Sequence, residues 1–308
     1  MKPIRIGLVG IGKIARDQHI PALRADRAFD LAACASRNAD VDGARNYRSI
    51  EAMLDGEPDL EAVAICTPPQ FHFDAARLAL GRGKHVFLEK PPCATTAELD
   101  ALATLARAAG RTLFQSWHSR YAAAVEPARR WLAGKTVRAG RIVWKEDVRH
   151  WHPGQTWIWE AGGFGIFDPG INAISILTAI LPEHVRVARA HFLVPSNCAA
   201  PIAAEIDFEA ASGAAIRAEM DFRHTGVQTW DIDVETDGDT LKLSNGGADM
   251  AVNGERVAVA QSAGEYPLLY RRFASLAADG ASDVDVVPFQ LVADAFLVAR
   301  HTSVEPFE

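Results

Sequence analysis

The sequence lacks several features that would place it in a specialised class of protein. Only four of its 308 residues are cysteines, at positions 34, 66, 93 and 198, and their spacing is not paired. We therefore expect reduced thiols and a cytoplasmic protein. No apolar run approaches 18 residues, which argues against a membrane-spanning helix. Residues 1–3 lead straight into a strand-like run, so we expect no secretory signal.

An excess of positive charge is also missing. The chain has 32 lysines and arginines against 39 aspartates and glutamates, a formal net charge of −7. This balance argues against partners such as nucleic acid or an anionic membrane surface. The chain is 49% hydrophobic and 23% charged, which is typical of a globular protein, and its length allows two domains.

The first motif that is present is GIGKIA, in which Gly10, Gly12 and Ala15 have the spacing G-x-G-x-x-A. A strand-like run, residues 4–9, precedes it, and a helix-like stretch to about Leu23 follows. The first glycine of such a motif makes a tight turn, and the second lets the backbone approach a pyrophosphate. The helix N-terminus then faces the phosphates. The position of the motif, between a strand and a helix, predicts a dinucleotide site.

The tip of the next predicted strand, residues 29–35, bears on which dinucleotide binds. Chains that bind NAD usually carry a carboxylate there, whereas this sequence has Ser36 and Arg37. A guanidinium suits the 2′-phosphate of NADP. We predict NADP as the preferred cofactor, with NAD as a second option; the alternative is that Arg37 is an ordinary surface residue.

Strands and helices continue to alternate over residues 1–119, which predicts a Rossmann-type domain with a parallel sheet. The further expected elements are strands 62–66, 85–88 and 113–117, a helix 71–80, and a helix opened by the capping-box pair Thr95 and Glu98. Ligands of such sheets bind beyond the carboxyl ends of the strands. Lys90 stands at one of these ends, so we interpret it as an active-site residue; the alternative is a solvated surface lysine. Two prolines follow it, and we hypothesise that one of their peptide bonds is cis.

From about residue 120 the pattern changes to strands with alternating apolar and polar positions. The expected strands are 137–148, 185–194, 203–208, 214–224, 229–236 and 240–243. In one of them Trp230 and Ile232 face one way while Asp231 and Asp233 face the other. We predict a second domain, residues 120–308, of α+β type with an open, mainly antiparallel sheet that has one covered and one polar face.

One carboxylate breaks this alternation. In an extended RIVWKEDV segment, Glu146 shares the apolar side with Trp144, and a buried charge needs a partner or a task. Sugar hydroxyls would suit it; the alternative is a register slip that exposes it. The next segment, RHWHPGQTWIWE, has three tryptophans, whose rings can pack on the C–H face of a sugar. We discount a metal site at His150 and His152, because no third ligand has a persuasive spacing.

The segment GGFGIFDPGINAISIL brings two more polar residues into the second domain. Asp168 and Asn172 are four positions apart and share a face if both are helical. Asp168 before Pro169 is also a good N-cap, which would need no catalytic role. The residues alone leave these two interpretations open.

The stretches GIGKIARDQHIPAL, AICTPPQFH, GKHVFLEKP and GGFGIFDPGIN together resemble the Gfo/Idh/MocA family of oxidoreductases, over essentially the whole chain. The stretch VWKEDVRHWHPGQTWIWE resembles the subgroup of sugar 1-dehydrogenases that act on L-arabinose and D-galactose. In the family, the lysine of E-K-P lies at the reacting end of the nicotinamide, and a second motif reads D-x-G-x-H. The matches here are Lys90, Asp168 and Asn172. The asparagine replaces a histidine that many members use as general base, and an amide cannot do that, although it can orient a hydroxyl.

The resemblance implies NAD(P)-dependent oxidation of a cyclic aldose (L-arabinose, D-galactose or D-fucose) at C1 to the lactone. The hydride passes to the nicotinamide and the O1 proton to a base. The implied catalytic residues are Lys90, Asp168 and Asn172. The implied cofactor contacts are Gly10, Gly12, Lys13, Ile14, Ser36, Arg37, Thr67, Pro68, His72 and Glu89. The implied sugar contacts are Lys90, His118, Glu146, Trp151, His152, Asp168, Asn172 and Trp230. No metal is expected, and a homodimer contact through the open sheet is an option that the family offers.

Two rival functions stay open. One is a cyclitol or other polyol dehydrogenase of the same family, or a reductase working in the opposite direction. The other is a sugar sensor that binds NADP without turnover. Asn172 and the tryptophans argue mildly against the first, and retention of Glu89, Lys90 and Asp168 argues against the second.

Overall fold

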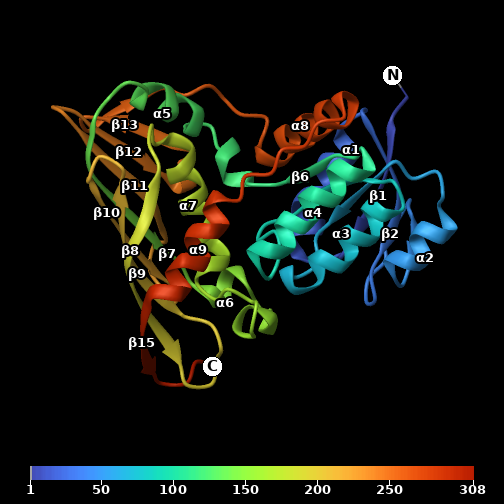
Figure 1. The fold of residues 1–308 in the computed structure, drawn as a ribbon, viewed down its shortest axis with the longest axis horizontal. Coiled ribbons are helices and arrows are strands. Elements are labelled where there is room, and N and C mark those ends of the chain that lie inside the picture. The colour runs from blue at the N-terminus through green and yellow to red at the C-terminus, as the bar shows by residue number, and fades with distance from the viewer. Residues whose placement is uncertain (1) are drawn as a thin grey trace. The chain divides into compact units, whose positions relative to one another are not determined.

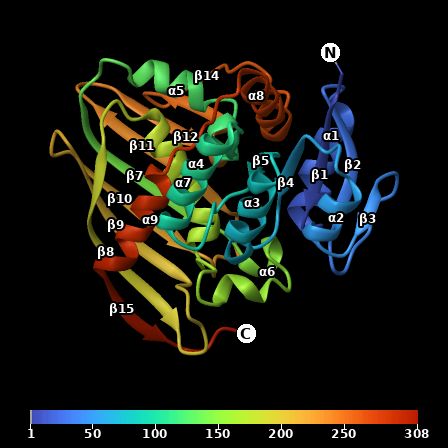
Figure 2. The same cartoon turned by 45° about the vertical axis from the view of Figure 1, so that its right-hand side comes forward.

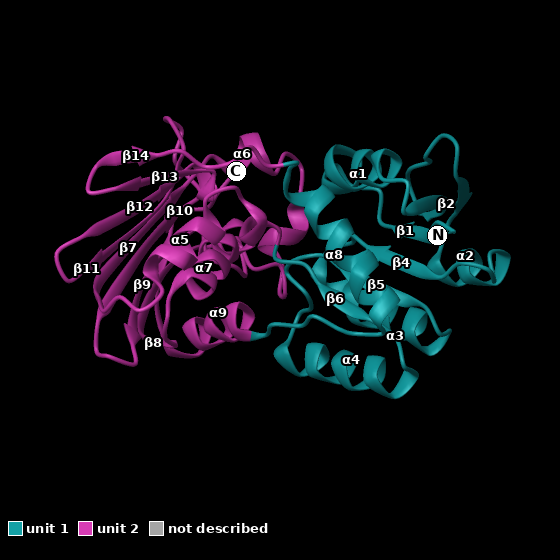
Figure 3. Ribbon diagram, turned by 90° about the horizontal axis from the view of Figure 1, so that it is seen from above, with its two compact units in different colours: residues 1–117, 263–286 teal, residues 118–262, 287–308 magenta. Residues whose placement is uncertain are grey.

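The computed structural model describes residues 2–308, which form two compact units (Figure 3). Unit 1 contains the described residues up to Trp117 together with Ala263–Val286. Unit 2 contains His118–Ser262 and Val287–Glu308. The first boundary lies close to the predicted one at 119/120. The prediction of one continuous second domain differs from the structure, because Ala263–Val286 returns to unit 1.

Unit 1 is built on a six-stranded parallel sheet in the order β3-β2-β1-β4-β5-β6, of which Figure 1 labels β1, β2 and β6. The strands are β1 (Ile4–Val9), β2 (Phe29–Ala35), β3 (Arg45–Tyr47), β4 (Ala62–Ile65), β5 (His85–Leu88) and β6 (Leu113–Gln115). All four residues of β4 are buried, as expected when helices cover both faces of a sheet. The predicted Rossmann-type sheet is confirmed; the short β3 was not predicted.

The helices of unit 1 are α1 (Ile20–Ala25), α2 (Ile50–Gly56), α3 (His72–Gly81), α4 (Thr96–Ala109) and α8 (Glu265–Asp279). A π-helical turn, Ala15–His19, comes directly before α1. Pro21 accounts for this wider turn, because it has no N–H and its ring clashes with the carbonyl four residues earlier. The predicted capping box of Thr95 and Glu98 is present at the start of α4.

Helix α8 belongs to unit 1 because of its aromatic face. Tyr270 packs on the rings of Phe29 and Phe87 at centroid distances of 5.3 and 4.9 Å, and Phe273 contacts Phe87 at 5.6 Å. Tyr270 and Phe273 are fully buried. Burial of such large apolar surfaces stabilises the contact, so this distant segment completes the core around β5.

Unit 2 is built on a nine-stranded sheet in the order β14-β13-β12-β11-β7-β10-β9-β8-β15. Its strands are β7 (Val137–Lys145), β8 (Val185–Pro195), β9 (Ala203–Ala210), β10 (Ala215–Asp221), β11 (Thr229–Thr236), β12 (Thr240–Ser244), β13 (Asp249–Val252), β14 (Glu255–Val257) and β15 (Ala299–Val304). Only the pairs β7–β10 and β8–β15 are parallel. The mainly antiparallel sheet is confirmed, and β13, β14 and β15 were not predicted.

Three helices of unit 2, α5 (Val125–Leu132), α7 (Phe167–Ile180) and α9 (Val287–Val298), lie over one face of this sheet (Figure 2). Helix α7 approaches the sheet closely at Gly170, where a Cβ atom would lie 2.6 Å from Sδ of Met220 in β10. A larger residue at this position, between Asp168 and Asn172, would force the Met220 side chain to move. The remaining short helical segments of unit 2 are His118–Tyr121, α6 (Val148–Trp151), Thr156–Trp159 and Asn245–Gly247.

Two further expectations can be compared with the structure. No helix within residues 2–308 is long and apolar enough to cross a membrane. The four cysteines are unpaired, and Cys34 and Cys66 are buried as predicted. Burial raises the pKa of the Cys34 thiol to about 11. A thiol in such a setting stays protonated and behaves as a small core residue.

Candidate active site

The glycine turn after β1 leaves room for a dinucleotide. Gly10 has φ +87°, and a Cβ atom there would lie 2.7 Å from the amide nitrogen of Thr67, so glycine is required. A Cβ on Gly12 would meet nothing within 4 Å. The hydroxyl of Thr67, at the end of β4, is buried without a hydrogen-bond partner in residues 2–308. This open backbone and spare hydroxyl fit a pyrophosphate, which the N–H groups of Gly12, Lys13 and Ile14 would hold.

Ser36 and Arg37 follow directly after β2. The Ser36 N–H donates to the carbonyl of Tyr47 at 3.0 Å, and Arg37 is exposed. Arg48 donates to the Ser36 carbonyl at 3.3 Å and forms an ion pair with Asp40 at 2.8 Å. Asp40, one of the two acidic residues of this loop, is therefore engaged by an arginine. A hydroxyl and a guanidinium at this position are compatible with the 2′-phosphate of NADP.

His72 links the loops that follow β4 and β5. It is fully buried, with Nε2 2.5 Å from the carbonyl oxygen of Thr67 and Nδ1 3.1 Å from that of Pro92. Burial lowers the pKa of His72, so the ring is neutral and its single N–H donates to one of the two carbonyls. These contacts connect His72 to the turn that contains Thr67, and its predicted contact with the cofactor stays a prediction.

Lys90 lies at the tip of β5, half-buried, and its peptide bond to Pro91 is cis, as hypothesised. The carboxylate of the buried Glu89 accepts the Lys90 N–H at 2.7 Å. This contact ties the backbone of the lysine to a fixed group. The position of the lysine at a strand end is as predicted.

Glu89 is itself held by two residues that the sequence did not single out. It accepts hydrogen bonds from His19 Nε2 at 2.9 Å and from the Tyr266 hydroxyl at 2.7 Å. His19 Nδ1 in turn accepts from the Tyr270 hydroxyl at 2.7 Å. Burial and the charge of Glu89 raise the pKa of Tyr266, so its phenol stays protonated and donates. A lone histidine after the glycine motif and two tyrosines one turn apart are visible in the sequence, but only the fold brings them to Glu89.

We expect Tyr266→Phe to lower kcat five- to tenfold and to destabilise the protein by about 1.5 to 3 kcal/mol, because a buried carboxylate loses a donor. The matched control is Tyr47→Phe. Tyr47 donates to the equally buried Glu57 at 2.9 Å, in the same unit but away from β5. Denaturant unfolding should give similar losses for both variants, and only Tyr266→Phe should lower kcat. If Tyr266→Phe and Tyr47→Phe have the same kcat, Tyr266 contributes to stability alone.

Unit 2 contributes a second group of polar residues. Glu146 directly follows β7, is 3% exposed and accepts the indole N–H of Trp230 at 2.8 Å. The predicted burial with a partner is confirmed, and the alternative of an exposed Glu146 is wrong. The strand expected to run to Val148 ends at Lys145, because Asp147 accepts the Arg149 N–H and caps α6.

His152, just after α6, lies between two carboxylates. Its Nε2 is 3.7 Å from Oε1 of Glu146, and its Nδ1 is 3.6 Å from Oδ2 of Asp168. The His152 side chain is 15% exposed, against about 4% and 5% for the two carboxylates. No group of three or more His, Cys, Asp or Glu side chains in residues 2–308 is arranged to hold a metal ion.

Asp168 and Asn172 are both inside α7, which begins at Phe167, so they share one helix face. The N-cap is Ile166, and the alternative interpretation of Asp168 as N-cap is wrong because the helix starts before it. Both side chains are buried. The amide oxygen Oδ1 of Asn172 has no hydrogen-bond partner in residues 2–308. A buried acceptor without a partner is costly, so this atom needs a donor from elsewhere.

The indole N–H groups of Trp151 and Trp230 are both engaged within the protein. Trp151 donates its N–H to Gln228 at 2.8 Å, and Trp230 donates to Glu146, so both donors are already used. The two rings lie 5.3 Å apart, and Trp230 also stacks on Trp144 at 6.0 Å. The predicted sugar contact of Trp151 and Trp230 stays a prediction.

His118 stands at the start of unit 2. The ring is half-buried, and the hydroxyl of Ser119 lies 3.3 Å from its Nδ1. The nearby Arg120 donates to the carbonyl of Ser175 and to the Thr178 hydroxyl, both at 2.9 Å, and so pins this segment to α7. The predicted contact of His118 with sugar or nicotinamide stays a prediction.

Comparison with known proteins identifies the family. A family model described as an oxidoreductase family with an NAD-binding Rossmann fold matches residues 4–116. A galactose 1-dehydrogenase of Pseudomonas fluorescens is 47% identical over 307 residues, which cover 100% of this chain and 99% of that protein. The chain belongs to the Gfo/Idh/MocA family.

Solved structures agree with this assignment. The crystal structure of a D-galactose-1-dehydrogenase from Rhizobium etli matches with a TM-score of 0.94 and 52% identity, over 100% of this chain and 99% of that one. A 3-ketoreductase from Actinomadura kijaniata, solved with NADP and TDP-benzene, matches with a TM-score of 0.86 and 19% identity, over 98% and 99% of the two chains. At that identity the second match shows a shared fold. As a member of the Gfo/Idh/MocA family, the protein is an NAD(P)-binding oxidoreductase.

Proposed function

We propose that this member of the Gfo/Idh/MocA family oxidises D-galactose, or an aldose of the same configuration such as L-arabinose or D-fucose, at C1 to the lactone. The observation that carries the proposal is the spare acceptor of Asn172 beside Asp168 on α7, within a group that also holds Glu146 and His152. Sugars carry many hydroxyl donors and acceptors and suit such a site. The two galactose dehydrogenase relatives support the choice of sugar.

The proposed catalytic residues are Lys90, Asp168 and Asn172. Oxidation at C1 requires the O1 proton to leave as the C1 hydride leaves, so a positioned base is needed. We assign Asp168 as that base, Lys90 as the cation that stabilises developing charge on O1, and Asn172 as the group that orients a sugar hydroxyl. Trp151 and Trp230 would pack on the apolar face of the ring.

The proposed cofactor is NADP in preference to NAD. Support comes from Ser36 and Arg37 after β2 and from the arginine that already neutralises Asp40. When bound, the nicotinamide supplies the hydride acceptor. The glycine turn and Thr67 would hold the pyrophosphate, and Lys13 would lie beside it, although its ammonium also pairs with Asp17.

The test is absorbance at 340 nm with purified protein, first with NADP and then with NAD. The sugars are D-galactose, L-arabinose, D-fucose, D-xylose, D-glucose and myo-inositol. We expect reduction with the first three sugars only, and a higher kcat/KM with NADP. Reduction with myo-inositol alone would favour the cyclitol dehydrogenase. Tight NADP binding without turnover on any sugar would favour the sensor.

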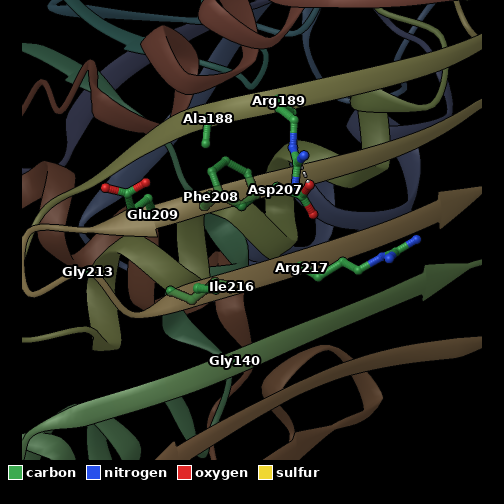
Figure 4. Close-up of a pocket in the computed structure, with 10 residues that line it drawn as sticks. Gly140, Ala188, Arg189, Asp207, Phe208, Glu209, Gly213, Ile216 and Arg217 are labelled. Carbon is green, nitrogen blue, oxygen red and sulfur yellow. Dashed lines mark hydrogen bonds and ion pairs between the residues drawn. The ribbon is translucent and has the colours of Figure 1, made fainter.

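We also propose that two copies associate through the outer face of the nine-stranded sheet, and that the protein is cytoplasmic. The outer face carries rows of opposite charges, such as Arg217 with Glu205 and Arg189 with Asp207. A recess there, of about 250 Å³, is lined by Arg189, Asp207 and Arg217 and by Gly140 (Figure 4). Sedimentation should give twice the chain mass of 33.3 kDa, and a monomer would contradict the dimer.

A further inference from the structure

We infer that His152 takes the proton from Asp168 after Asp168 has removed it from O1 of the sugar. This inference rests on the proposed function. The observation behind it is the placement of one imidazole between two buried carboxylates. Nδ1 faces Asp168 at 3.6 Å and Nε2 faces Glu146 at 3.7 Å. Two ionised carboxylates that are buried close together destabilise each other unless a positive charge or a proton lies between them.

The surroundings of His152 within unit 2 fit this role. Two charged groups that face the ring are Glu146, from the end of β7, and Asp168, from α7. The side-chain oxygen of Gln155 lies 3.4 Å from Nδ1, and the ring of Phe222 contacts the imidazole at 5.5 Å. These contacts restrict the movement of the ring. Distances slightly above hydrogen-bond length commonly shorten when substrate binds.

The proposed step balances as follows. The O1–H bond breaks and its proton binds to a carboxylate oxygen of Asp168, while the electron pair of that bond forms the C1=O double bond. The C1–H pair leaves as hydride to the cofactor. Asp168 then passes the proton to Nδ1 of His152, and Glu146 stabilises the imidazolium. Water that reaches the partly exposed ring then takes the same proton from Nδ1, which restores both side chains.

The presence of Asn172 at this position means that another residue has to accept the proton from Asp168. It shares a face of α7 with Asp168, but an amide cannot accept the proton. The Asp168 side chain is 5% exposed, so it has little direct access to water. His152 is the more exposed partner and can exchange protons between solvent and the buried carboxylate. Because it acts through Asp168, His152 is a positioning and relay residue.

The first test does not depend on any sugar. The ring signals of His152 in heteronuclear NMR are assigned by their loss in His152→Gln and followed against pH. We expect Glu146→Gln and Asp168→Asn each to move the titration to lower pH by about half a unit or more, since each removes a neighbouring negative charge. The control His150→Gln, an exposed residue of the same short helix, should leave it unchanged. An unchanged titration in either carboxylate variant would overturn the relay.

The second test uses turnover of D-galactose. We expect His152→Gln to lower kcat about 100-fold with KM within about threefold of wild type. Adding imidazole to His152→Ala should raise the kcat of that variant at least tenfold. A raised KM with unchanged kcat, or a loss in kcat that imidazole does not restore, would leave His152 as a sugar contact or structural residue and overturn the inference. If the wild type oxidises no sugar, the proposed function fails, while the NMR titration still decides whether His152 is coupled to both carboxylates.

Discussion

Replacing Lys90 by methionine is expected to lower kcat at least about 10³-fold while NADP binding stays measurable. Methionine keeps the length of the side chain and removes the charge that would stabilise O1 as its proton leaves. The Glu89 carboxylate, which accepts the backbone N–H at position 90, is untouched by the change. The measurements are steady-state kinetics with D-galactose and NADP titration by fluorescence.

The matched control is Lys84→Met, at the other end of β5. Its ammonium donates to the carbonyls of Pro58 and Leu60, both at 2.7 Å, and burial lowers its pKa. This variant should lose stability and keep its kcat. Lys90→Arg keeps the positive charge and changes the shape of the side chain. We expect its kcat to remain well below the wild-type value because the guanidinium is larger and planar. Turnover of Lys90→Met within tenfold of wild type would remove Lys90 from the mechanism.

Replacing Asp168 by asparagine is expected to lower kcat by about 10³-fold as well. The two side chains have the same shape, and Asp168 lies inside α7 next to the tightly packed Gly170, so the helix should keep its position. The amide cannot accept the O1 proton, and it presents no negative charge to His152. Steady-state kinetics across a pH series should show a low kcat at every pH.

The control for this change is Asp237→Asn, in the turn between β11 and β12 of the same unit. Asp237 pairs with Arg138 at 2.5 Å, and both side chains are exposed. Such a surface pair contributes little to stability, so stability and kcat should stay near wild type. If Asp168→Asn retains more than a tenth of the wild-type kcat, Asp168 is not the base, and the proton must leave O1 by another route.

Local patterns in the sequence were enough to predict several local features of unit 1. Gly10 and Gly12 between a strand and a helix, the capping box at Thr95, and Lys90 at a strand end are all arranged as predicted. Alternation along β11 and β10 also predicted which face of the second sheet is covered. These features depend on neighbours within a few residues, so a single sequence carries them.

The return of Ala263–Val286 to unit 1 was decided by the tertiary structure. The aromatic residues of α8 can pack on any apolar surface of the right size, and nothing in their spacing specifies β5 as that surface. The same is true of Tyr266 and His19, which lie 247 positions apart in the chain and both bind Glu89. Hydrogen bonds between such distant residues depend on the topology of the whole unit.

The sequence by itself determined the family, the Rossmann-type sheet and the candidate residues Lys90, Asp168 and Asn172. Only the tertiary structure placed Glu146, His152 and Asp168 together, because they come from a strand end, a loop and a helix that the order of strands in the sheet brings side by side. It also decided that Asp168 lies within α7 and not at its cap. Periodicity specifies which residues share a face, whereas packing specifies which faces meet.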